Sequence, residues 1–468
     1  MKPRELANLG VPKHAMKTAI ETVVALLGDG HSKTNVRLMI AGAVAAPDDH
    51  LEREPLATLA RALQPAARPD GAFIERREPA PWRQWGEGLD ENSIEQMRNA
   101  CRLPVAVRAA LMPDAHLGYG LPIGGVLATS NAVIPYAVGV DIACRMKLTV
   151  LDLPESALRG QSERLADALE TQTRFGLGAA FRDRNDHDVL DADWTVSPVT
   201  TRFKDKAWTQ LGTSGSGNHF VEFGRFTVDD PAHARTLGLE PGTYLALLSH
   251  SGSRGTGASV ADHYSRLAMD LHPELPKPLR HLAWLDLDTE PGQEYWRAMN
   301  LMGEYAAANH AIIHRRIAKH LGARIIADVE NHHNFAWAER HDDQDVIVHR
   351  KGATPAGEGV LGVIPGSMAS PAFVVRGRGS VSALDSASHG AGRVMSRTEA
   401  KRSFTWSDVK KHLAARGVTL LSAGLDEVPM VYKDIHTVMA AQTDLVEILA
   451  TFDPCIVKMA PPGERAED

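Results

Sequence analysis

The sequence predicts an α+β fold, with one large domain of mixed sheets and helices and a small helical extension at the N-terminus. Short β-like runs and helical patterns alternate irregularly along the chain, without a regular strand–helix–strand rhythm. No G-x-G-x-x-G motif opens a helix, which argues against a doubly wound dinucleotide fold. A single change of pattern near residue 82 divides the chain into residues 1–82 and 83–468.

Residues 1–82 are predicted to be a helical extension that ends in a linker. Apolar residues recur at helical spacing over Ala15–Leu27 and again over Leu51–Leu63. Pro65–Pro81 contains four prolines together with Arg76 and Arg77, a composition typical of a linker.

Residues 83–468 are predicted to form the large domain, because no further composition break or repeat follows. The β-like runs are Val126–Thr129, Tyr244–Leu248, Asp345–His349 and Ala372–Arg376. The expected helices are Tyr295–Lys319, which is the longest, Ser407–Ala415 and Ile435–Thr451.

The composition indicates a folded protein with a sizeable core, since 44% of the 468 residues are hydrophobic. The formal net charge of -7 excludes bulk attraction to nucleic acid, so any such partner requires a local basic cleft. Three scattered cysteines cannot build a disulfide framework, and a reducing, cytoplasmic setting is expected. No signal peptide and no membrane span are expected, because no apolar stretch approaches the ~20 residues that a span needs.

Six segments at the ends of apolar runs are rich in histidine, asparagine, cysteine or arginine, and five of them also contain glycine. They are 113–120 (PDAHLGYG), 139–146 (GVDIACRM), 212–220 (GTSGSGNHF), 250–255 (HSGSRG), 331–335 (NHHNF) and 388–397 (SHGAGRVMSR). Glycines let backbone N–H groups approach a ligand closely, while imidazole, thiolate and carboxylate groups bind divalent metals. The sequence therefore predicts a metal and phosphate site that is assembled from loops.

The predicted metal ligands are Asp141, Cys144, His219, His250 and His333. Asp141 and Cys144 lie three apart and can reach one ion from a tight turn, although a buried core cysteine with a capping aspartate is the alternative. The three histidines stand beside Gly, Ser or Asn, which makes simple core packing less natural. One carboxylate, one thiolate and three imidazoles suit Mn²⁺, Zn²⁺ or Fe²⁺ better than Mg²⁺.

His389 is the predicted phosphate-directed histidine, acting as general acid or as nucleophile. Glycines follow it, and Arg393 and Arg397 lie four apart, on one face if a helix begins there. A glycine-rich turn with two solvated arginines is the alternative. Arg254, Arg350 and Lys351 could add phosphate-binding cations, although for Arg350 and Lys351 alone a solvated face is the preferred interpretation.

Over roughly residues 85–458, these six segments in this order resemble the RtcB family of RNA ligases, which includes tRNA-splicing ligases. The segments 113–125 (PDAHLGYGLPIGG), 250–255 and 389–397 follow the family pattern nearly letter for letter. The resemblance implies a ligase dependent on GTP and two Mn²⁺ ions, acting in RNA splicing or repair. Its partner would be RNA with a 3′-phosphate or 2′,3′-cyclic phosphate and RNA with a 5′-hydroxyl; an activating protein partner is left open.

The resemblance also implies roles for individual residues. His389 would be guanylylated, would pass GMP to the RNA 3′-phosphate, and the 5′-hydroxyl would then displace GMP. Asp141, Cys144, His219, His250 and His333 would hold the two ions. The nucleotide site would be lined by Asn218, Glu222, His333, Asn334, Pro365, Gly366, Ser367, Met368, His389, Gly390, Ala391, Gly392, Tyr432 and Lys458, with Glu222 and Tyr432 at the guanine. Phosphate or RNA contacts would come from Arg254, Lys351, Arg393 and Arg397.

The chain departs from the family pattern at three places. Ala143 and Arg145 replace two glycines beside the metal cysteine, so a positive φ at residue 143 would be costly, and a guanidinium adjoins the thiolate. Ala369 and Ala372 replace a Gly and a guanine-binding Ser, which removes one hydrogen bond to the base. Ten residues, 459–468, follow Lys458, where the family often ends.

Two other functions are compatible with these residues. A metal-dependent phosphodiesterase that opens 2′,3′-cyclic phosphates without sealing would need the metal ligands but no complete guanine pocket. A non-catalytic module that binds RNA ends is suggested by Arg145 alone, and it would not require a nucleophile, metal ligands and arginines together.

Overall fold

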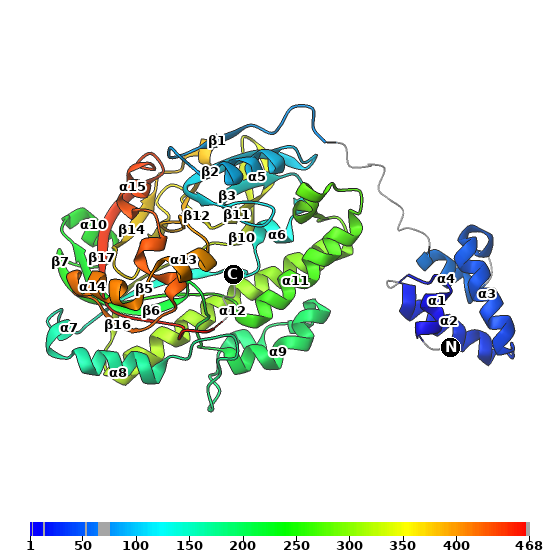
Figure 1. The fold of residues 1–468 in the computed structure, drawn as a ribbon, viewed down its shortest axis with the longest axis horizontal. Coiled ribbons are helices and arrows are strands. Elements are labelled where there is room, and N and C mark those ends of the chain that lie inside the picture. The colour runs from blue at the N-terminus through cyan, green and yellow to red at the C-terminus, as the bar shows by residue number, and fades with distance from the viewer. Residues whose placement is uncertain (2, 13–14, 52–53, 64–74, 465–468) are drawn as a thin grey trace. The chain divides into compact units, whose positions relative to one another are not determined.

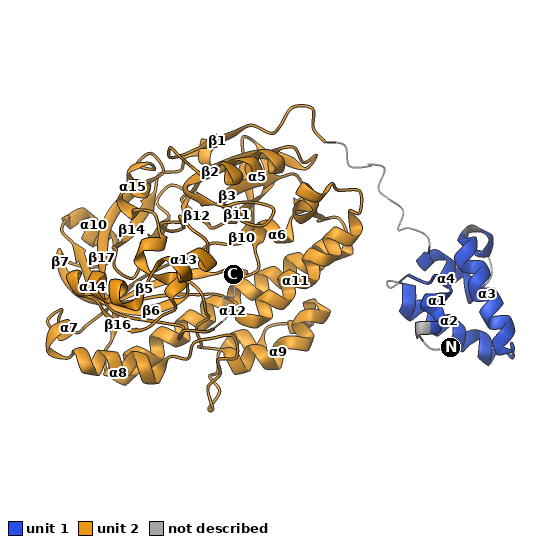
Figure 2. Cartoon of the chain, viewed as in Figure 1, with its two compact units in different colours: residues 1–74 blue, residues 75–468 orange. Residues whose placement is uncertain are grey.

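The computed structural model describes residues 1–468 except 2, 13–14, 52–53, 64–74 and 465–468 (Figure 1). The chain forms two compact units, residues 1–74 and 75–468 (Figure 2). In the described ranges no helix combines the length and the apolar composition that crossing a membrane requires.

The smaller unit is a cluster of short helices. They are α1 (Pro3–Asn8), α2 (Met16–Gly28), α3 (Lys33–Ala45) and α4 (Leu56–Leu63). Helices α2 and α4 confirm the helical spacing in the sequence, whereas α3 was not predicted. The start of α3 is fixed by Ser32, whose side chain accepts a hydrogen bond from the backbone N–H of Asn35 at 3.2 Å. A shared core, which includes Leu6, Val23, Ile40 and Leu59, holds the helices together.

Part of the predicted linker, residues 65–74, lies outside the described residues. The remaining part belongs to the larger unit, because the backbone N–H of Arg76 bonds to the carbonyl of Arg102 at 3.0 Å and that of Ala80 to Cys101 at 2.7 Å. The compact larger unit thus begins at Glu75, before the sequence-based boundary at residue 83.

Two large sheets form the centre of the larger unit. The eight-stranded sheet has the order β13–β14–β17–β6–β7–β5–β9, with β16 beside β17; the five-stranded sheet has the order β1–β2–β3–β11–β10. Among the described strands, only β1–β2 and β16–β17 pair in parallel. Sheets that are mostly antiparallel, together with helices that do not alternate regularly with the strands, confirm the α+β prediction.

The four β-like runs predicted from the sequence all lie in strands, namely β3, β7, β11 and β14. The strands are β1 (Trp82–Gln84), β2 (Ala106–His116), β3 (Ile123–Thr129), β4 (Ala132–Val133), β5 (Arg145–Leu151), β6 (Phe220–Val228), β7 (Gly242–Ser251), β8 (Leu285–Asp286), β9 (Ile325–His332), β10 (Phe335–His341), β11 (Gln344–Lys351), β12 (Ala353–Pro355), β13 (Leu361–Ile364), β14 (Ala372–Gly377), β15 (Ser386–Ser388), β16 (Thr419–Ser422) and β17 (Val446–Met459).

Helices of the larger unit pack outside these sheets, and α8, α9, α11 and α12 run along one side of it (Figure 1). The helices are α5 (Glu91–Cys101), α6 (Pro135–Val138), α7 (Ala157–Gly160), α8 (Ser162–Gln172), α9 (Pro198–Gln210), α10 (Pro231–Thr236), α11 (Arg254–Leu271), α12 (Glu290–Leu321), α13 (Arg397–Ser403), α14 (Trp406–Ala415) and α15 (Ile435–Ala440). Helix α12 contains the longest predicted helix; Thr289 caps its start and Gly322, at φ 61°, ends it.

The prediction of one helix over Ile435–Thr451 is wrong. Only α15, residues Ile435–Ala440, is helical, and Val446 begins the long strand β17. This strand lies between β14 and β6 and contributes to cores on both of its faces. Residues 446–451 (VEILAT) do not alternate regularly between apolar and polar, so periodicity could not distinguish this part of the strand from a helix.

Candidate functional site

A cavity of about 140 Å³, open to solvent, lies where the motif segments meet. The predicted site residues that line it are Asp141, Cys144, Asn218, His219, Glu222, His250, His333, Asn334, Pro365, Gly366, Ser367, Met368, His389, Gly390, Ala391, Gly392, Arg393, Arg397 and Tyr432.

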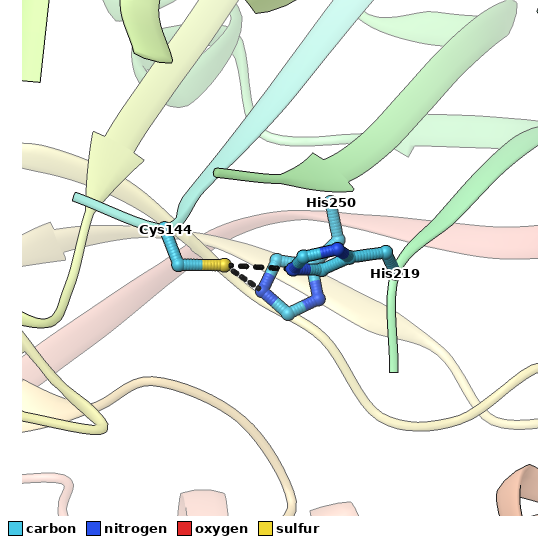
Figure 3. A group of neighbouring side chains, drawn as sticks. All are labelled: Cys144, His219 and His250. Carbon is cyan, nitrogen blue, oxygen red and sulfur yellow. Dashed lines mark hydrogen bonds between the residues drawn. The ribbon is translucent and has the colours of Figure 1, made fainter. Parts of the chain in front are cut away.

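Three adjacent strands bring Cys144, His219 and His250 together. Cys144 precedes β5, His219 precedes β6, and His250 lies on β7, where it is paired with Met146 on one side and Phe220 on the other. The sulfur of Cys144 lies 3.0 Å from Nε2 of His250 and 3.3 Å from Nε2 of His219 (Figure 3). All three side chains are buried, and their donor atoms could hold one metal ion.

Asp141 and His333 extend this cluster to five potential ligands. Asp141 Oδ2 lies 3.0 Å from Nε2 of His219, and Nε2 of His333 lies 3.2 Å from Nε2 of His250. Burial lowers the pKa of His250 to about 3 and lowers the pKa of His333, so both rings are neutral.

The donor set fits a cation. Nδ1 of His250 faces the carbonyl oxygen of Asn218 at 3.1 Å and must carry the proton, which leaves a lone pair on Nε2. That lone pair faces the sulfur of Cys144 and the ring of His333 within about 3 Å. Lone pairs that converge in a buried place are stabilised by a metal ion between them.

Tight backbone geometry surrounds the cluster. Ala143 has φ 56°, so the residue that replaces a glycine of the family pattern does occupy the left-handed region. Its N–H donates to the carbonyl of Asn334 at 2.9 Å. Gly252 approaches Asp141 so closely that a Cβ there would lie 2.1 Å from the carboxylate. Arg145 is directed to Glu330, with Nη1 2.9 Å from Oε1, and does not line the cavity.

His389 is oriented by Asp114. Nδ1 of His389 donates to Oδ2 of Asp114 at 2.7 Å, and the carboxylate also accepts the backbone N–H of His389 at 3.3 Å. The bond at Nδ1 leaves Nε2 as the unprotonated nitrogen. Gly392, at φ 76°, makes this approach feasible, since a Cβ there would lie 2.0 Å from the carbonyl oxygen of Asp114. Asp114 was not among the predicted site residues, although it lies in the first motif.

Arg393 and Arg397 meet two buried carboxylates. Arg393 donates to the carbonyl of Asp426 at 2.8 Å and lies 3.3 Å from Glu427, and Arg397 pairs with both acids. The hydroxyl of Tyr432 also donates to Glu427. No helix joins the two arginines, because α13 begins at Arg397, behind its cap Ser396. The sequence did not predict Glu427, which lines the cavity.

Glu222, Met368, Ala372 and Tyr432 also line the cavity. Glu222 is 5% exposed, and burial raises the pKa of its carboxyl well above the ordinary value. Ala372 presents only a methyl group. A carboxyl group can bond to the polar edge of a base, and an aromatic ring can stack on its flat face.

Three predicted ligand-binding residues do not line the cavity. Lys458 lies between Val457 and Met459, which do line it, and strand alternation directs its Nζ to the carbonyl of Leu169 at 3.1 Å. Arg254 is buried and donates to the carbonyl of Gly176 at 2.8 Å. Lys351 is buried and donates to the carbonyls of Tyr119 and Tyr136 at 2.5 and 2.9 Å.

The solvated face considered for Arg350 and Lys351 is wrong. Their exposures are 1% and 5%. Arg350 pairs with Glu339 on β10 and lies 4.7 Å over the ring of Trp337, so it is a structural residue of the five-stranded sheet. Burial lowers the pKa of Lys351 to about 7.

The chain is similar in sequence to proteins of one known family. The family model described as tRNA-splicing ligase RtcB matches residues 96–196 and 186–459. The RNA-splicing ligase RtcB of Escherichia coli is 34% identical over 410 residues, which cover 80% of this chain and 96% of that protein. The tRNA-splicing ligase RtcB of Thermococcus kodakarensis is 31% identical over 420 residues, 75% of this chain and 86% of that protein. The RNA-splicing ligase RtcB of Mycobacterium tuberculosis is 32% identical over 431 residues, which cover 77% of this chain and 98% of that protein.

Proposed function

Because this chain belongs to the RtcB family of RNA-splicing ligases, we propose that it joins an RNA 3′-phosphate or 2′,3′-cyclic phosphate end to a 5′-hydroxyl end. The reaction would use GTP and pass through a guanylylated His389 and an RNA whose 3′-phosphate carries GMP. The observation that supports it most is the pair formed by His389 and Asp114 on the wall of a cavity that also holds five potential metal ligands. Residues 83–468 would be the catalytic domain, and residues 1–82 lie outside the family match.

The metal ligands of the proposed enzyme are Asp141, Cys144, His219, His250 and His333. Their mixture of thiolate, imidazole and carboxylate donors suits two Mn²⁺ ions, which tolerate softer donors. When bound, the ions would neutralise charge on the reacting phosphates. The fold positions these ligands, because β5, β6 and β7 are neighbours in one sheet. The carbonyl of Asn218 also fixes the orientation of the His250 ring.

The chemistry of this chain begins at Nε2 of His389. Asp114 holds the proton on Nδ1, so the lone pair of Nε2 can attack the α-phosphate of GTP while pyrophosphate leaves. Asp114 also stabilises the positive charge that develops on the ring. Arg393 and Arg397 would bind phosphate oxygens, and Glu222 and Tyr432 would bind the guanine.

A combined measurement tests this function. Incubation with GTP and Mn²⁺ should add one GMP to the protein by intact mass, and a defined RNA pair with 3′-phosphate and 5′-hydroxyl ends should be sealed. ATP and CTP serve as nucleotide controls. A phosphodiesterase that opens cyclic phosphates without sealing is the second candidate, motivated by Ala372, which lines the cavity where the family pattern has a guanine-binding Ser. It would open the cyclic phosphate and gain no GMP.

The proposed setting is the cytoplasm, supported by three free cysteines, Cys101, Cys144 and Cys455. An activating protein partner is compatible with the proposal and can be tested by adding cell extract to the sealing assay.

Replacing Ala372 with serine should lower the GTP concentration that the enzyme requires. Ala372 lines the cavity. The proposed function assigns it to the end that binds the base, where a hydroxyl would supply one more hydrogen bond to guanine. One neutral hydrogen bond contributes about 0.5–1.5 kcal/mol, or roughly three- to tenfold in affinity. The GTP dependence of GMP attachment measures the effect. Ala369→Ser is the matched control, because Ala369 lines a different hollow; equal responses would refute the base-end assignment.

Replacing Asp114 with asparagine should slow GMP attachment without weakening GTP binding. The charge-assisted hydrogen bond to Nδ1 is worth about 1.5–3 kcal/mol, so a roughly 10- to 100-fold lower rate is expected. Single-turnover kinetics with labelled GTP separate the rate from the affinity. Asp444→Asn is the control, since Asp444 pairs with Trp85 outside the cavity. An unchanged rate for Asp114→Asn would remove Asp114 from the mechanism.

A further inference from the structure

We propose that His116 is the general base of the sealing step, where its Nε2 takes the proton from the 5′-hydroxyl of the incoming RNA. The inference rests on the proposed ligase function and extends it to a residue that the sequence did not single out. His116 is the last residue of β2, is paired with Ile123 at the start of β3, and lines the cavity together with His389.

One residue, Asp114, orients both histidines. Its carboxylate accepts from Nδ1 of His389 at 2.7 Å, and its main-chain carbonyl lies 3.1 Å from Nδ1 of His116. A carbonyl only accepts, so Nδ1 of His116 carries the proton and Nε2 carries a lone pair. That Nε2 makes no hydrogen bond to another residue of the described ranges. A neutral imidazole with a free lone pair on a cavity wall can accept a proton.

The segment that carries His116 is rigidly held. Lys433 donates its ammonium hydrogens to the carbonyls of Pro113 and Ala115 at 3.1 and 2.8 Å. The side chain of Gln96 bonds to both the N–H and the carbonyl of Gly118, at 3.0 and 2.6 Å. These hydrogen bonds, before and after His116 in the chain, fix its position, which proton transfer requires.

The other titratable groups of the cavity already have a task. Asp141, Cys144, His219, His250 and His333 are the metal ligands, and His389 carries GMP. Glu427 is engaged by Arg393, Arg397 and Tyr432. Glu222 is assigned to the guanine, and burial raises the pKa of its carboxyl, which favours the protonated form that cannot accept a further proton. His116 is the remaining imidazole on the wall.

Burial keeps His116 neutral before RNA binds. It is the main cause that lowers the pKa of His116 to about 4; Asp114 opposes this shift through its hydrogen bond and its charge, and the charges of His389 and Lys433 contribute to it. RNA phosphates in the cavity add negative charge, which raises the pKa towards the range where a base is effective.

The sealing step balances with His116 as proton acceptor. The 5′-oxygen forms a bond to the phosphorus of the activated RNA 3′-phosphate. The bond from that phosphorus to the oxygen that bridges to GMP breaks, and GMP leaves with the electron pair. The hydroxyl proton moves to Nε2 of His116, which later releases it to water.

The test separates three steps in the full-length enzyme: GMP attachment to the protein, transfer of GMP to an RNA 3′-phosphate without a 5′-hydroxyl partner, and sealing of purified GMP-activated RNA. His116→Gln should slow sealing about 100-fold, the contribution of a general base, and leave the first two steps within about threefold. These two steps also report whether the variant is folded. His281→Gln, which perturbs the ring contacts to Tyr119 and Tyr136 outside the cavity, should seal normally.

The pH profile distinguishes a base from a phosphate-binding cation. The wild-type sealing rate should rise with pH and then level off, and His116→Gln should lose this rise. Normal sealing by His116→Gln, equal losses in all three steps, or a wild-type rate that falls as His116 loses its proton would overturn the inference. A wild-type enzyme that gains no GMP refutes the proposed function itself, and is recognised before His116 is examined.

Discussion

His389→Ala is expected to abolish GMP attachment while the protein remains folded and retains its metal. The imidazole is half-buried on the cavity wall, and its loss removes the nucleophile without removing a predicted metal ligand. Intact mass after incubation with GTP and Mn²⁺ should show no added GMP, and no RNA should be sealed. Metal content and thermal unfolding should match those of the wild type.

The control for this variant is His412→Ala, which changes an exposed histidine on α14. It should acquire GMP at the wild-type rate. A GMP adduct on His389→Ala would show that another residue is the nucleophile, and peptide mapping of the adduct would then identify it.

Cys144→Ser should weaken Mn²⁺ binding by more than about 100-fold. A hydroxyl is a far poorer metal donor than a thiolate, and changes to groups that merely support a ligand already cost about 10- to 100-fold. Equilibrium dialysis with Mn²⁺ measures the effect without reference to activity. The weaker binding is expected to come from the lost metal–sulfur bond itself, because the sulfur lies within 3.3 Å of two imidazole nitrogens that would share the ion.

Cys455→Ser is the matched control for the metal experiment. Cys455 is half-buried on β17, its thiol faces the carbonyl of Asp453 at 3.6 Å, and it does not line the cavity. This variant should bind Mn²⁺ like the wild type. If Cys144→Ser kept both ions at unchanged affinity, Cys144 would be a core residue, which is the alternative that the sequence left open.

The sequence predicted a cluster of potential metal donors that the structure brings together, because donor type and local spacing are encoded within each motif. The cluster of Cys144, His219 and His250 forms as the motifs suggested, since each residue sits at the end of a strand in one sheet. The family was also readable from the motifs, and residues 96–459 match its model.

The direction of individual side chains could not be read in this way. Lys458 looked like a nucleotide ligand, yet alternation along β17 directs it away from the cavity. The start of the same strand was predicted to be helical, because residues 446–451 lack the regular alternation of apolar and polar residues that would identify a strand. Lys351 looked solvated but is buried under the loop that follows β2.

The partners of the reactive groups were decided by contacts between distant segments. Asp114 and His389 are 275 residues apart, and nothing in either motif indicates that the carboxylate holds the imidazole. Glu427 reaches Arg393 and Arg397 from a separate turn for the same reason. Local residue types fix which atoms can donate or accept, whereas pairing of β2, β3, β11 and β15 with their neighbours fixes which of those atoms meet.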